Sequence, residues 1–184
     1  MRILVHQCCG PCSFFTFEIL LKSQFEITAF FYNPNIHPYT EFLKRLENAK
    51  IVNKLFNIKG YFYRFYNIIS FLKNLPTSNR CFYCYNIRLK LTAAYAKKNH
   101  FDLFTTTLLY SKYQQHDVIK QIAQKYSHMY NIGFHYYDFR EGWEKGIERA
   151  RNNNIYMQKY CGCIFSEQER YIKKIKKNIK LEYV

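Results

Sequence analysis

The sequence predicts an α/β fold, with a Rossmann-like, mostly parallel sheet and helices on both faces. Short apolar stretches rich in aromatic and β-branched residues alternate along the chain with longer stretches of helical periodicity. Such alternation is typical of βαβ units, whose helices cover both faces of a parallel sheet. The chain has 184 residues and is 48% hydrophobic, which suits one core better than two. We therefore expect residues 1–184 to form a single domain.

The N-terminal third predicts two strand–helix units. Arg2 to His6 is a short apolar run and is expected to be a buried strand that ends in a tight turn. Cys12 to Lys22 then predicts a helix, and Phe25 to Tyr32 a second strand that ends at Asn33-Pro34-Asn35. A long helix follows from Pro38, which suits a first helical turn, to about Phe56.

The middle of the chain continues the alternation. A third strand is predicted over Tyr61 to Tyr66, followed by an irregular connection from Asn67 to Asn79 that contains a proline. Apolar residues at helical spacing predict a helix from Cys84 onward. Asp102 to Thr107 is expected to be a fourth strand and Gln114 to Tyr130 the helix after it.

The C-terminal part predicts a fifth strand over Phe134 to Phe139 and a helix near Glu141 to Asn152. A loop then carries a cysteine pair, and a final helix follows. Ser166 and Glu169 have the spacing of a capping box, which predicts that this helix starts at Ser166.

All seven cysteines fall in three short motifs, and none stands alone. The motifs are Cys8-Cys9-x-x-Cys12, Cys81-x-x-Cys84 and Cys161-x-Cys163. Close spacing lets a short loop direct several sulfurs at one metal, whereas structural cysteines scatter along a chain with the packing of the core. Disulfides are disfavoured in a cytoplasmic chain, and an odd number would leave one thiol unpaired. The motifs therefore predict that the seven thiols meet at one metal site.

The number of thiols indicates the kind of metal, and two other functions remain open. A structural zinc ion needs four thiolates, whereas seven are enough for a 4Fe-4S cluster with a further metal or with redox-active thiols. Adjacent side chains such as Cys8 and Cys9 are expected to diverge, which is awkward for one tetrahedral ion. A zinc module that binds RNA without catalysis remains an alternative, as does a thiol-disulfide oxidoreductase, because Cys9-Gly10-Pro11-Cys12 matches the thioredoxin motif. The dipole of the following helix is expected to lower thiolate pKa values there.

The charge of the chain predicts a polyanionic partner. The formal net charge is +15, from 28 Lys and Arg against 13 Asp and Glu, and 18 Tyr with 17 Phe offer rings on which bases could stack. Several lysines crowd one C-terminal stretch, namely Lys173, Lys174, Lys176, Lys177 and Lys180. The alternative explanation is a compositional bias that raises Lys, Asn, Ile, Tyr and Phe everywhere. The sequence contains neither a long apolar run nor a signal-peptide pattern, so we expect a cytoplasmic monomer with no membrane partner.

With these motifs placed, the chain resembles the QueH type of epoxyqueuosine reductase, the cobalamin-independent enzymes of the last step of queuosine synthesis in bacterial tRNA. The resemblance runs nearly from end to end. Its segments are HQCCGPC at 6–12, FYNPNIHPYTEFLKR at 31–45, RCFYCYNIRL at 80–89, FTTTLL at 104–109, YYDFREGW at 136–143 and QKYCGCIFSEQERY at 158–171.

The resemblance implies a single catalytic domain with an adenine-nucleotide-hydrolase-like sheet, in which cysteines replace the usual Gly-rich phosphate turn after the first strand. It implies an oxidoreductase that reduces epoxyqueuosine to queuosine at the wobble position of tRNA, with a 4Fe-4S cluster, an additional iron ion and an external electron donor. The expected cluster ligands are Cys8, Cys9, Cys81, Cys84, Cys161 and Cys163, and Cys12 is expected to be a further metal ligand. The family position that matches Cys12 can hold Asp instead.

Reducing an epoxide to an alkene takes two electrons and two protons, and no side chain supplies such electrons, so a cofactor must carry the step. Cys8 and Cys9 are therefore expected to be essential, and Tyr32 and Asp138 are the further catalytic candidates. Other candidates for proton donation or substrate positioning lie near predicted strand ends: His6, His37, Tyr113, Arg140 and the run from Thr105 to Thr107. Structural roles are open for each, including a core position for Tyr32, a turn for His37, an ion pair between Asp138 and Arg140, and a hydrogen bond from His6 to a sulfur.

Overall fold

A five-stranded sheet forms the centre of the computed structural model, which describes residues 1–178, with side chains described up to residue 172. The strands are β1 (Arg2–His6), β2 (Glu26–Phe31), β3 (Lys59–Phe62), β4 (Leu103–Thr106) and β5 (Gly133–Phe134). Their order is β3-β2-β1-β4-β5, and every neighbouring pair is parallel. The predicted open parallel sheet is confirmed.

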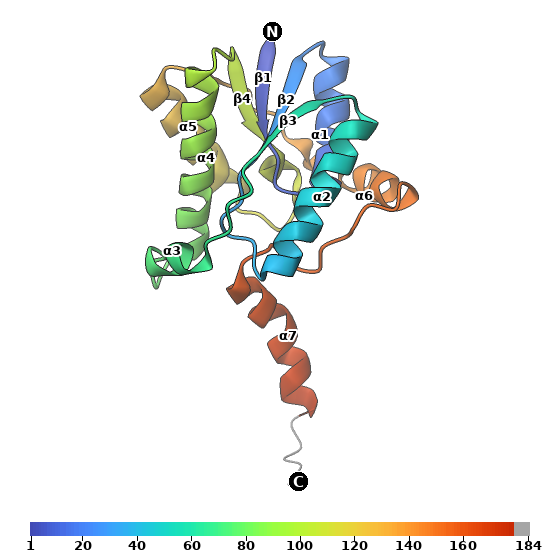
Figure 1. Ribbon diagram of the computed structural model, residues 1–184, viewed down its shortest axis with the longest axis vertical. Helices are drawn as coiled ribbons and strands as arrows, with labels where there is room; N and C mark the ends of the chain where they lie inside the picture. Colours follow the sequence, from blue (N-terminus) through green and yellow to red (C-terminus); the bar gives the residue numbers. More distant parts are fainter. Residues whose placement is uncertain (179–184) are drawn as a thin grey trace.

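Helices cover both faces of the sheet, as predicted (Figure 1). α1 (Gly10–Lys22) and α2 (Tyr39–Leu55) pack on one face, with α6 (Trp143–Asn152) against α1. α4 (Arg80–Lys98) and α5 (His116–Tyr130) pack on the other. The short α3 (Ile68–Lys73), the 3-10 helices η1 (Thr107–Tyr110) and η2 (Phe139–Gly142) and the terminal α7 (Ile164–Asn178) complete the fold. None of the helices in the described part of the chain has the length and apolar character needed to cross a membrane.

The central strand explains why the sheet is buried on both faces. Ile3, Leu4 and Val5 of β1 have no exposed surface, because α1 and α4 cover the two sides of this strand. A strand buried on both faces reads as a continuous run of branched apolar residues, which is the pattern that Arg2–His6 presents.

The starts of two helices that carry cysteines differ from the prediction, and a short helix lies in the predicted irregular connection. α5 also starts two residues later than predicted, at His116. α1 begins at Gly10, two residues earlier than predicted, because Pro11 suits the first helical turn. α4 begins at Arg80, so the second cysteine motif lies in its first turns and not before it. The predicted irregular connection contains α3, whose start is stabilised by the Asn67 side chain, which accepts a hydrogen bond from the Ser70 amide.

The remaining differences concern strand lengths and the last helix. β3 covers Lys59–Phe62, so it starts two residues and ends four residues before the predicted strand, in register with residues 28–31 of β2. β5 covers only Gly133–Phe134, because the chain leaves the sheet after pairing with residues 103 and 104. The predicted capping box is wrong, since α7 already starts at Ile164. The Ser166 hydroxyl instead donates to the Cys163 carbonyl at 2.7 Å. The predicted lysine cluster at 173–180 lies outside the residues whose side chains are described.

The strand order creates a switch point between β1 and β4. From β1 the chain adds β2 and β3 on one side, and it then crosses to place β4 and β5 on the other. In open α/β sheets, ligands bind beyond the carboxyl ends of the strands at such a point. Cys8 follows β1 there and Thr107 follows β4, so the first cysteine motif lies where this fold places ligands.

Candidate metal centre

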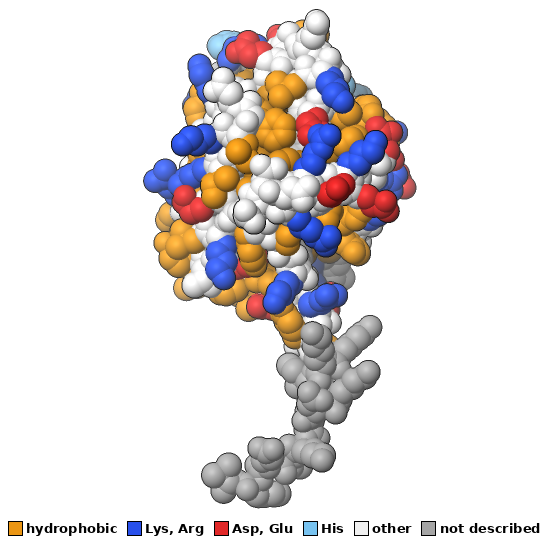
Figure 2. Space-filling model, turned by 90° about the vertical axis from the view of Figure 1, so that its right-hand side faces the viewer, with side chains coloured by type: hydrophobic (Ala, Val, Ile, Leu, Met, Phe, Trp, Pro, Cys, Tyr) orange, Lys and Arg blue, Asp and Glu red, His pale blue; other side chains and the backbone are white. Residues whose placement is uncertain are grey.

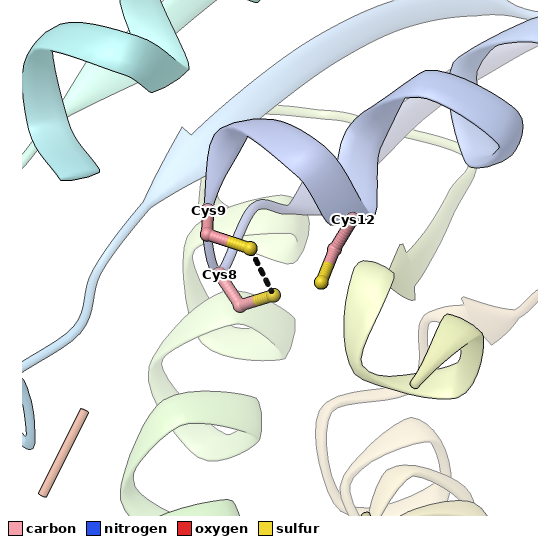
Figure 3. A group of neighbouring side chains, drawn as sticks. All are labelled: Cys8, Cys9 and Cys12. Atoms are coloured by element: carbon pink, nitrogen blue, oxygen red, sulfur yellow. Dashed lines mark hydrogen bonds between the residues drawn. The ribbon is translucent and has the colours of Figure 1, made fainter. Parts of the chain in front are cut away.

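Cys8, Cys9 and Cys12 form a compact sulfur group at this switch point (Figure 3). Their ligand atoms all lie within 4.8 Å of one another, and no other group of three or more metal-binding side chains in the described part of the chain meets this distance. Cys9 has no exposed surface and Cys12 is 5% exposed, whereas Cys8 is partly exposed. The group is therefore buried on the protein side and accessible at Cys8.

The separation of two sulfurs corrects one expectation from the sequence. The Sγ atoms of the adjacent Cys8 and Cys9 are 3.6 Å apart and do not diverge. They converge because Cys8 is still in the extended segment after β1, while Cys9 occupies the N-cap position of α1. Two thiolates on one tetrahedral ion lie about 3.8 Å apart when each metal–sulfur bond is about 2.3 Å. The spacing therefore fits two ligands of a common metal ion.

Side chains from distant segments hold the sulfurs in place. The Thr107 hydroxyl accepts a hydrogen bond from the Cys8 amide at 3.0 Å and lies 3.0 Å from the Cys8 Sγ, to which it donates. The Gln158 side-chain amide donates to the Cys9 Sγ at 3.0 Å. Such outer partners orient metal ligands. The first motif is thus positioned by the end of β4 and by the segment before Cys161.

The thiols of this group differ in acidity. Hydrogen bonds from the Cys12 and Cys9 thiols hold the pKa of Cys8 well below its usual value, and the charge of Arg88 and the Thr107 hydroxyl act in the same direction. Burial raises the pKa of Cys9 to about 12, and hydrogen bonding to Cys8 and Cys9 raises that of Cys12. The helix dipole was expected to lower the thiol pKa values in this motif. At Cys9 and Cys12 the pKa values are raised instead, because desolvation and the neighbouring thiolate oppose ionisation.

The other two cysteine motifs face each other at the same end of the molecule. Cys81, Cys84 and Arg88 follow one side of α4 at positions i, i+3 and i+7. Burial raises the pKa of Cys84 to about 11, and the charge of Cys161 adds to the rise at both Cys81 and Cys84. Cys81 and Cys161 are exposed. The prediction that these four thiols share a centre with the first motif stays a prediction.

The Cys161–Cys163 loop has a fixed shape. Gly162 has φ of +120°, a conformation that favours glycine, and a Cβ there would lie 3.0 Å from Arg45. The buried Arg45 donates to the carbonyls of Tyr160 and Cys161 at 2.8 and 2.9 Å, and it pairs with Glu41 at 2.7 Å. Hydrogen bonds from Cys163 and Ser166 lower the pKa of Cys161 to about 5. The loop therefore presents one acidic thiol on a rigid support.

Arg88 is a buried cation among the cysteines. It is 4% exposed, and no carboxylate of the described residues lies within ion-pair distance of it. Its guanidinium donates to Asn33 Oδ1 at 2.7 Å, to His6 Nε2 at 3.3 Å and to the Cys84 Sγ at 3.7 Å. A buried charge is costly unless an opposite charge compensates it. The thiolates of the cysteine motifs are the anions that face Arg88.

His6 supports Arg88 as a neutral side chain. It is completely buried, and burial together with the charge of Arg88 lowers its pKa to about 3. Nδ1 faces the Thr106 hydroxyl at 2.9 Å, and Nε2 lies 3.2 Å from the Tyr32 carbonyl and 3.3 Å from Arg88 Nε. Both ring nitrogens of His6 are therefore engaged within the protein, and the ring supports the Arg88 guanidinium.

We predict that Arg88→Met weakens metal binding. The substitution keeps an apolar stem but removes the positive charge that faces the thiolates. Loss of an outer partner of a metal ligand typically costs roughly 10–100-fold in metal affinity. Metal content per chain after a challenge with a chelator measures the effect, and circular dichroism of the metal-free protein shows whether the fold is retained.

Arg140→Met is the matched control for this prediction. Arg140 pairs with Asp138 at 2.6 Å, is partly exposed and has no hydrogen bond to a cysteine among the described residues. It should retain metal as the unaltered protein does, and Arg88→Lys should retain more metal than Arg88→Met. A folded Arg88→Met protein that holds metal as tightly as the unaltered chain would contradict the charge argument.

Tyr32, His37 and Tyr113, the next predicted candidates, differ in burial and in their contacts. Tyr32 is partly buried at the end of β2, and its carbonyl lies 3.2 Å from His6 Nε2. His37 is buried, and its backbone bonds the third motif, with its amide donating to the Gly162 carbonyl and its carbonyl accepting from Tyr160. Tyr113 is 83% exposed and packs on Trp143.

Asp138 and the threonines complete the list. Hydrogen bonds from Arg140 lower the pKa of Asp138, so this side chain is a carboxylate at neutral pH. Its catalytic role stays a prediction. The run from Thr105 to Thr107 is fully buried, and two of its hydroxyls contact site residues, Thr106 at His6 and Thr107 at Cys8.

Three residues of the centre are not evident from local sequence patterns: Arg45, Arg88 and Gln158. The available signal was an arginine on the apolar side of a predicted helix. Arg45 follows Phe42 by three residues and Arg88 follows Cys84 by four, so both occupy faces that the pattern predicts to be buried. Gln158 has no such signal, because its role depends on how a loop returns to Cys9.

The fold has counterparts among solved structures. A predicted subunit of a tRNA methyltransferase from Methanocaldococcus jannaschii is similar over 82% of this chain and 74% of its own, with a TM-score of 0.54 and 12% identity. A deacetylase of teicoplanin biosynthesis is similar over 97% of this chain and 93% of its own, with a TM-score of 0.50 and 9% identity. At such low identity these likenesses support the fold alone, an α/β fold of the kind that the sequence predicts.

Sequence comparison is more specific. The family model described as epoxyqueuosine reductase QueH matches residues 3–169. The epoxyqueuosine reductase QueH of Thermotoga maritima is 34% identical, covering 91% of each chain. That of Dehalococcoides mccartyi is 30% identical over 92% of this chain and 94% of its own. The chain therefore belongs to the QueH family of epoxyqueuosine reductases.

Proposed function

We propose that this protein reduces epoxyqueuosine to queuosine at the wobble position of tRNA, the last step of queuosine synthesis. The observation that carries the proposal is the converging sulfur group of Cys8, Cys9 and Cys12, located at the switch point of the sheet in a chain that matches the QueH family from residue 3 to 169. The substrate also accounts for the charge of +15, because tRNA is a polyanion.

The proposed reaction balances with two electrons and two protons. Both carbon–oxygen bonds of the epoxide break, a carbon–carbon double bond forms in their place, and the oxygen leaves as water. The electrons come from an external low-potential carrier, because no side chain supplies them. The carrier is oxidised as the epoxide is reduced.

The seven cysteines are the proposed ligands of a 4Fe-4S cluster and an additional iron ion. When bound, these metals supply electrons one at a time and a Lewis acid for the epoxide oxygen. The protein contributes thiols of unequal acidity: the pKa values of Cys8 and Cys161 are lowered, whereas those of Cys9 and Cys84 are raised. Arg88 faces the thiolates as a fixed positive charge.

Tyr32 is the better placed of the two proposed proton donors. It follows β2, directly beside the end of β1 from which Cys8 extends, and burial raises its pKa, so its hydroxyl keeps its proton at neutral pH. Asp138 is an ionised carboxylate paired with Arg140, so it has no proton to donate. Tyr32→Phe should therefore lower turnover while leaving the metal content unchanged.

The metal content of anaerobically purified protein tests the proposal against its alternatives. We expect a brown protein with iron and acid-labile sulfide. It should convert epoxyqueuosine to queuosine in tRNA from cells that lack this reductase, when a low-potential reductant is added and the digested nucleosides are separated by chromatography. A colourless zinc protein would support a non-catalytic module instead, and a metal-free protein a thiol-disulfide oxidoreductase. The substrate places the reaction in the cytoplasm.

A further inference from the structure

The positive charge of the chain is concentrated in one segment. Residues 48–101 contain ten Lys and Arg and no Asp or Glu. All 13 acidic residues therefore lie elsewhere. On the face of the molecule that carries α1, α2 and α6, Lys and Arg are mixed with Asp and Glu (Figure 2). A single acid-free segment thus supplies most of the net charge, which favours contact with a polyanion there.

Part of this segment, from the end of β3 through α3 to the first turns of α4, forms one side of the cysteine site. Arg64 and Lys73 lie in this part and have exposed side chains. Lys54, Lys97 and Lys98 lie instead in the last turns of α2 and α4, at the far ends of these helices. The phosphates of a nucleic acid that approaches the side of the cysteine site would contact Arg64 and Lys73, and its bases would then face the cysteines.

A half-open pocket lies within this basic segment. Its volume is about 190 Å³, and it lies between the connection after β3 and the first turns of α4. Aromatic rings and two amide side chains line it: Tyr32, Tyr63, Phe65, Phe71, Tyr83, Asn67 and Asn74. Aromatic rings offer stacking surfaces to any base, and amides offer both donors and acceptors to base edges.

The rings of the pocket are held in place, and two of them are exposed. Tyr63 packs edge-on against Tyr32 with ring centroids 5.2 Å apart, and Phe71 packs against Tyr83 at 6.1 Å. Phe65 is 62% exposed, and Tyr63 is 46% exposed. Exposed rings beside cations are the pattern of single-stranded nucleic-acid sites, where bases stack and phosphates meet the basic groups.

We propose that this pocket binds an unstacked nucleobase of the substrate RNA, adjacent to the modified wobble base. The proposal rests on the proposed function, since it takes tRNA as the substrate. It adds a second contact that selects the single-stranded anticodon loop over a helical region, because only a loop can present two neighbouring bases out of their stack.

The pocket borders the site of reduction, because Tyr32, the proposed proton donor, is one of its lining residues. None of its lining residues, all within the described part of the chain, is a cysteine. Tyr83 and Ile87 line it from α4, and each directly precedes a residue of the cysteine site, Cys84 and Arg88. The two sites are therefore adjacent surfaces of one helix, as adjacent nucleotides require.

The test measures binding of a labelled anticodon stem–loop RNA with guanine at the wobble position to the anaerobically purified full chain. Base–aromatic stacking contributes about 1–3 kcal/mol per base, so Phe65→Ala should weaken the Kd by roughly 5–150-fold. Phe65→Tyr, which keeps a ring, should bind nearly as the unaltered protein does. Tyr130→Ala, on the partly buried ring at the far end of α5, is the matched control and should keep the original Kd.

RNA with an abasic nucleotide on either side of the wobble position identifies the occupant. One of these two RNAs should bind the unaltered protein as weakly as the intact RNA binds Phe65→Ala. This abasic RNA should bind Phe65→Ala with little further loss of affinity, because the abasic change and the substitution remove the same contact. Fully additive losses would overturn the proposal, as would a Kd of Phe65→Ala equal to that of the unaltered chain.

The outcome can be separated from that of the proposed function, because the probe contains no epoxide. Binding that depends on Phe65 in a protein without reductase activity would refute the function and retain the pocket. Reduction of epoxyqueuosine with no effect of Phe65→Ala on binding would refute the pocket alone. If the phenylalanine side chain instead docks a protein electron donor, RNA binding stays unchanged, which also overturns the proposal.

Discussion

Replacing Cys8 by Ser is expected to abolish the reduction of epoxyqueuosine while leaving the fold intact. Cys8 is the thiol with the lowered pKa in the first motif, and it is the exposed side of the buried sulfur group. A hydroxyl keeps the size of the side chain but is a poor metal ligand. The loss of turnover should exceed the roughly 10–100-fold that follows removal of an outer partner of a metal ligand. The rate of queuosine formation and the iron content per chain measure the effect.

Cys12→Asp is the matched control for Cys8→Ser. The resemblance to the family implies that the position of Cys12 can hold Asp, and a carboxylate is an accepted metal ligand. This variant should retain iron and measurable turnover. Cys8→Ser should keep the thermal midpoint of the metal-free protein to within a few degrees, because a thiol-to-hydroxyl change at the partly exposed Cys8 removes little apolar contact. Full activity of Cys8→Ser would refute the assignment of the metal site.

Binding of tRNA is expected to weaken steeply with salt. The basic segment from residue 48 to 101 carries ten positive charges and no negative ones. A protein that contacts about 6–10 phosphates loses roughly 10³–10⁵ in affinity between about 50 and 200 mM salt, because binding releases condensed counterions. The Kd for unmodified tRNA, measured over this range of KCl, tests the expectation.

Substitutions that each remove one positive charge test which residues cause the salt dependence. Arg64→Gln and Lys73→Gln should each reduce the slope of log Kd against log salt by about one. Lys22→Gln, at the opposite end of the molecule in the last turn of α1, should leave the slope unchanged. A flat salt response of the unaltered protein would show instead that its lysines reflect composition and not a tRNA surface.

Much of the architecture follows from local sequence. The apolar run of β1 predicted a central strand because both faces of a parallel sheet are buried, and that strand lies at the centre. Helical periodicity located α2 and α5 to within a few residues. Boundaries were missed where a single side chain decides them, as with the cap of Asn67 on α3. β5 was overestimated because its sequence has strand propensity, while only two of its residues find a partner.

By itself, the sequence determined the fold class, the three cysteine motifs and the segments that identify the family, because spacing along the chain already limits which thiols one loop can present. The tertiary structure alone decided the environment of those thiols. It brings Thr107 and Gln158 to Cys8 and Cys9. It also buries Arg88 between His6, Asn33 and Cys84, with no carboxylate of the described side chains within ion-pair distance. The acidity of a thiol and the cost of a buried charge depend on neighbours that are distant in the chain, and only folding brings them together.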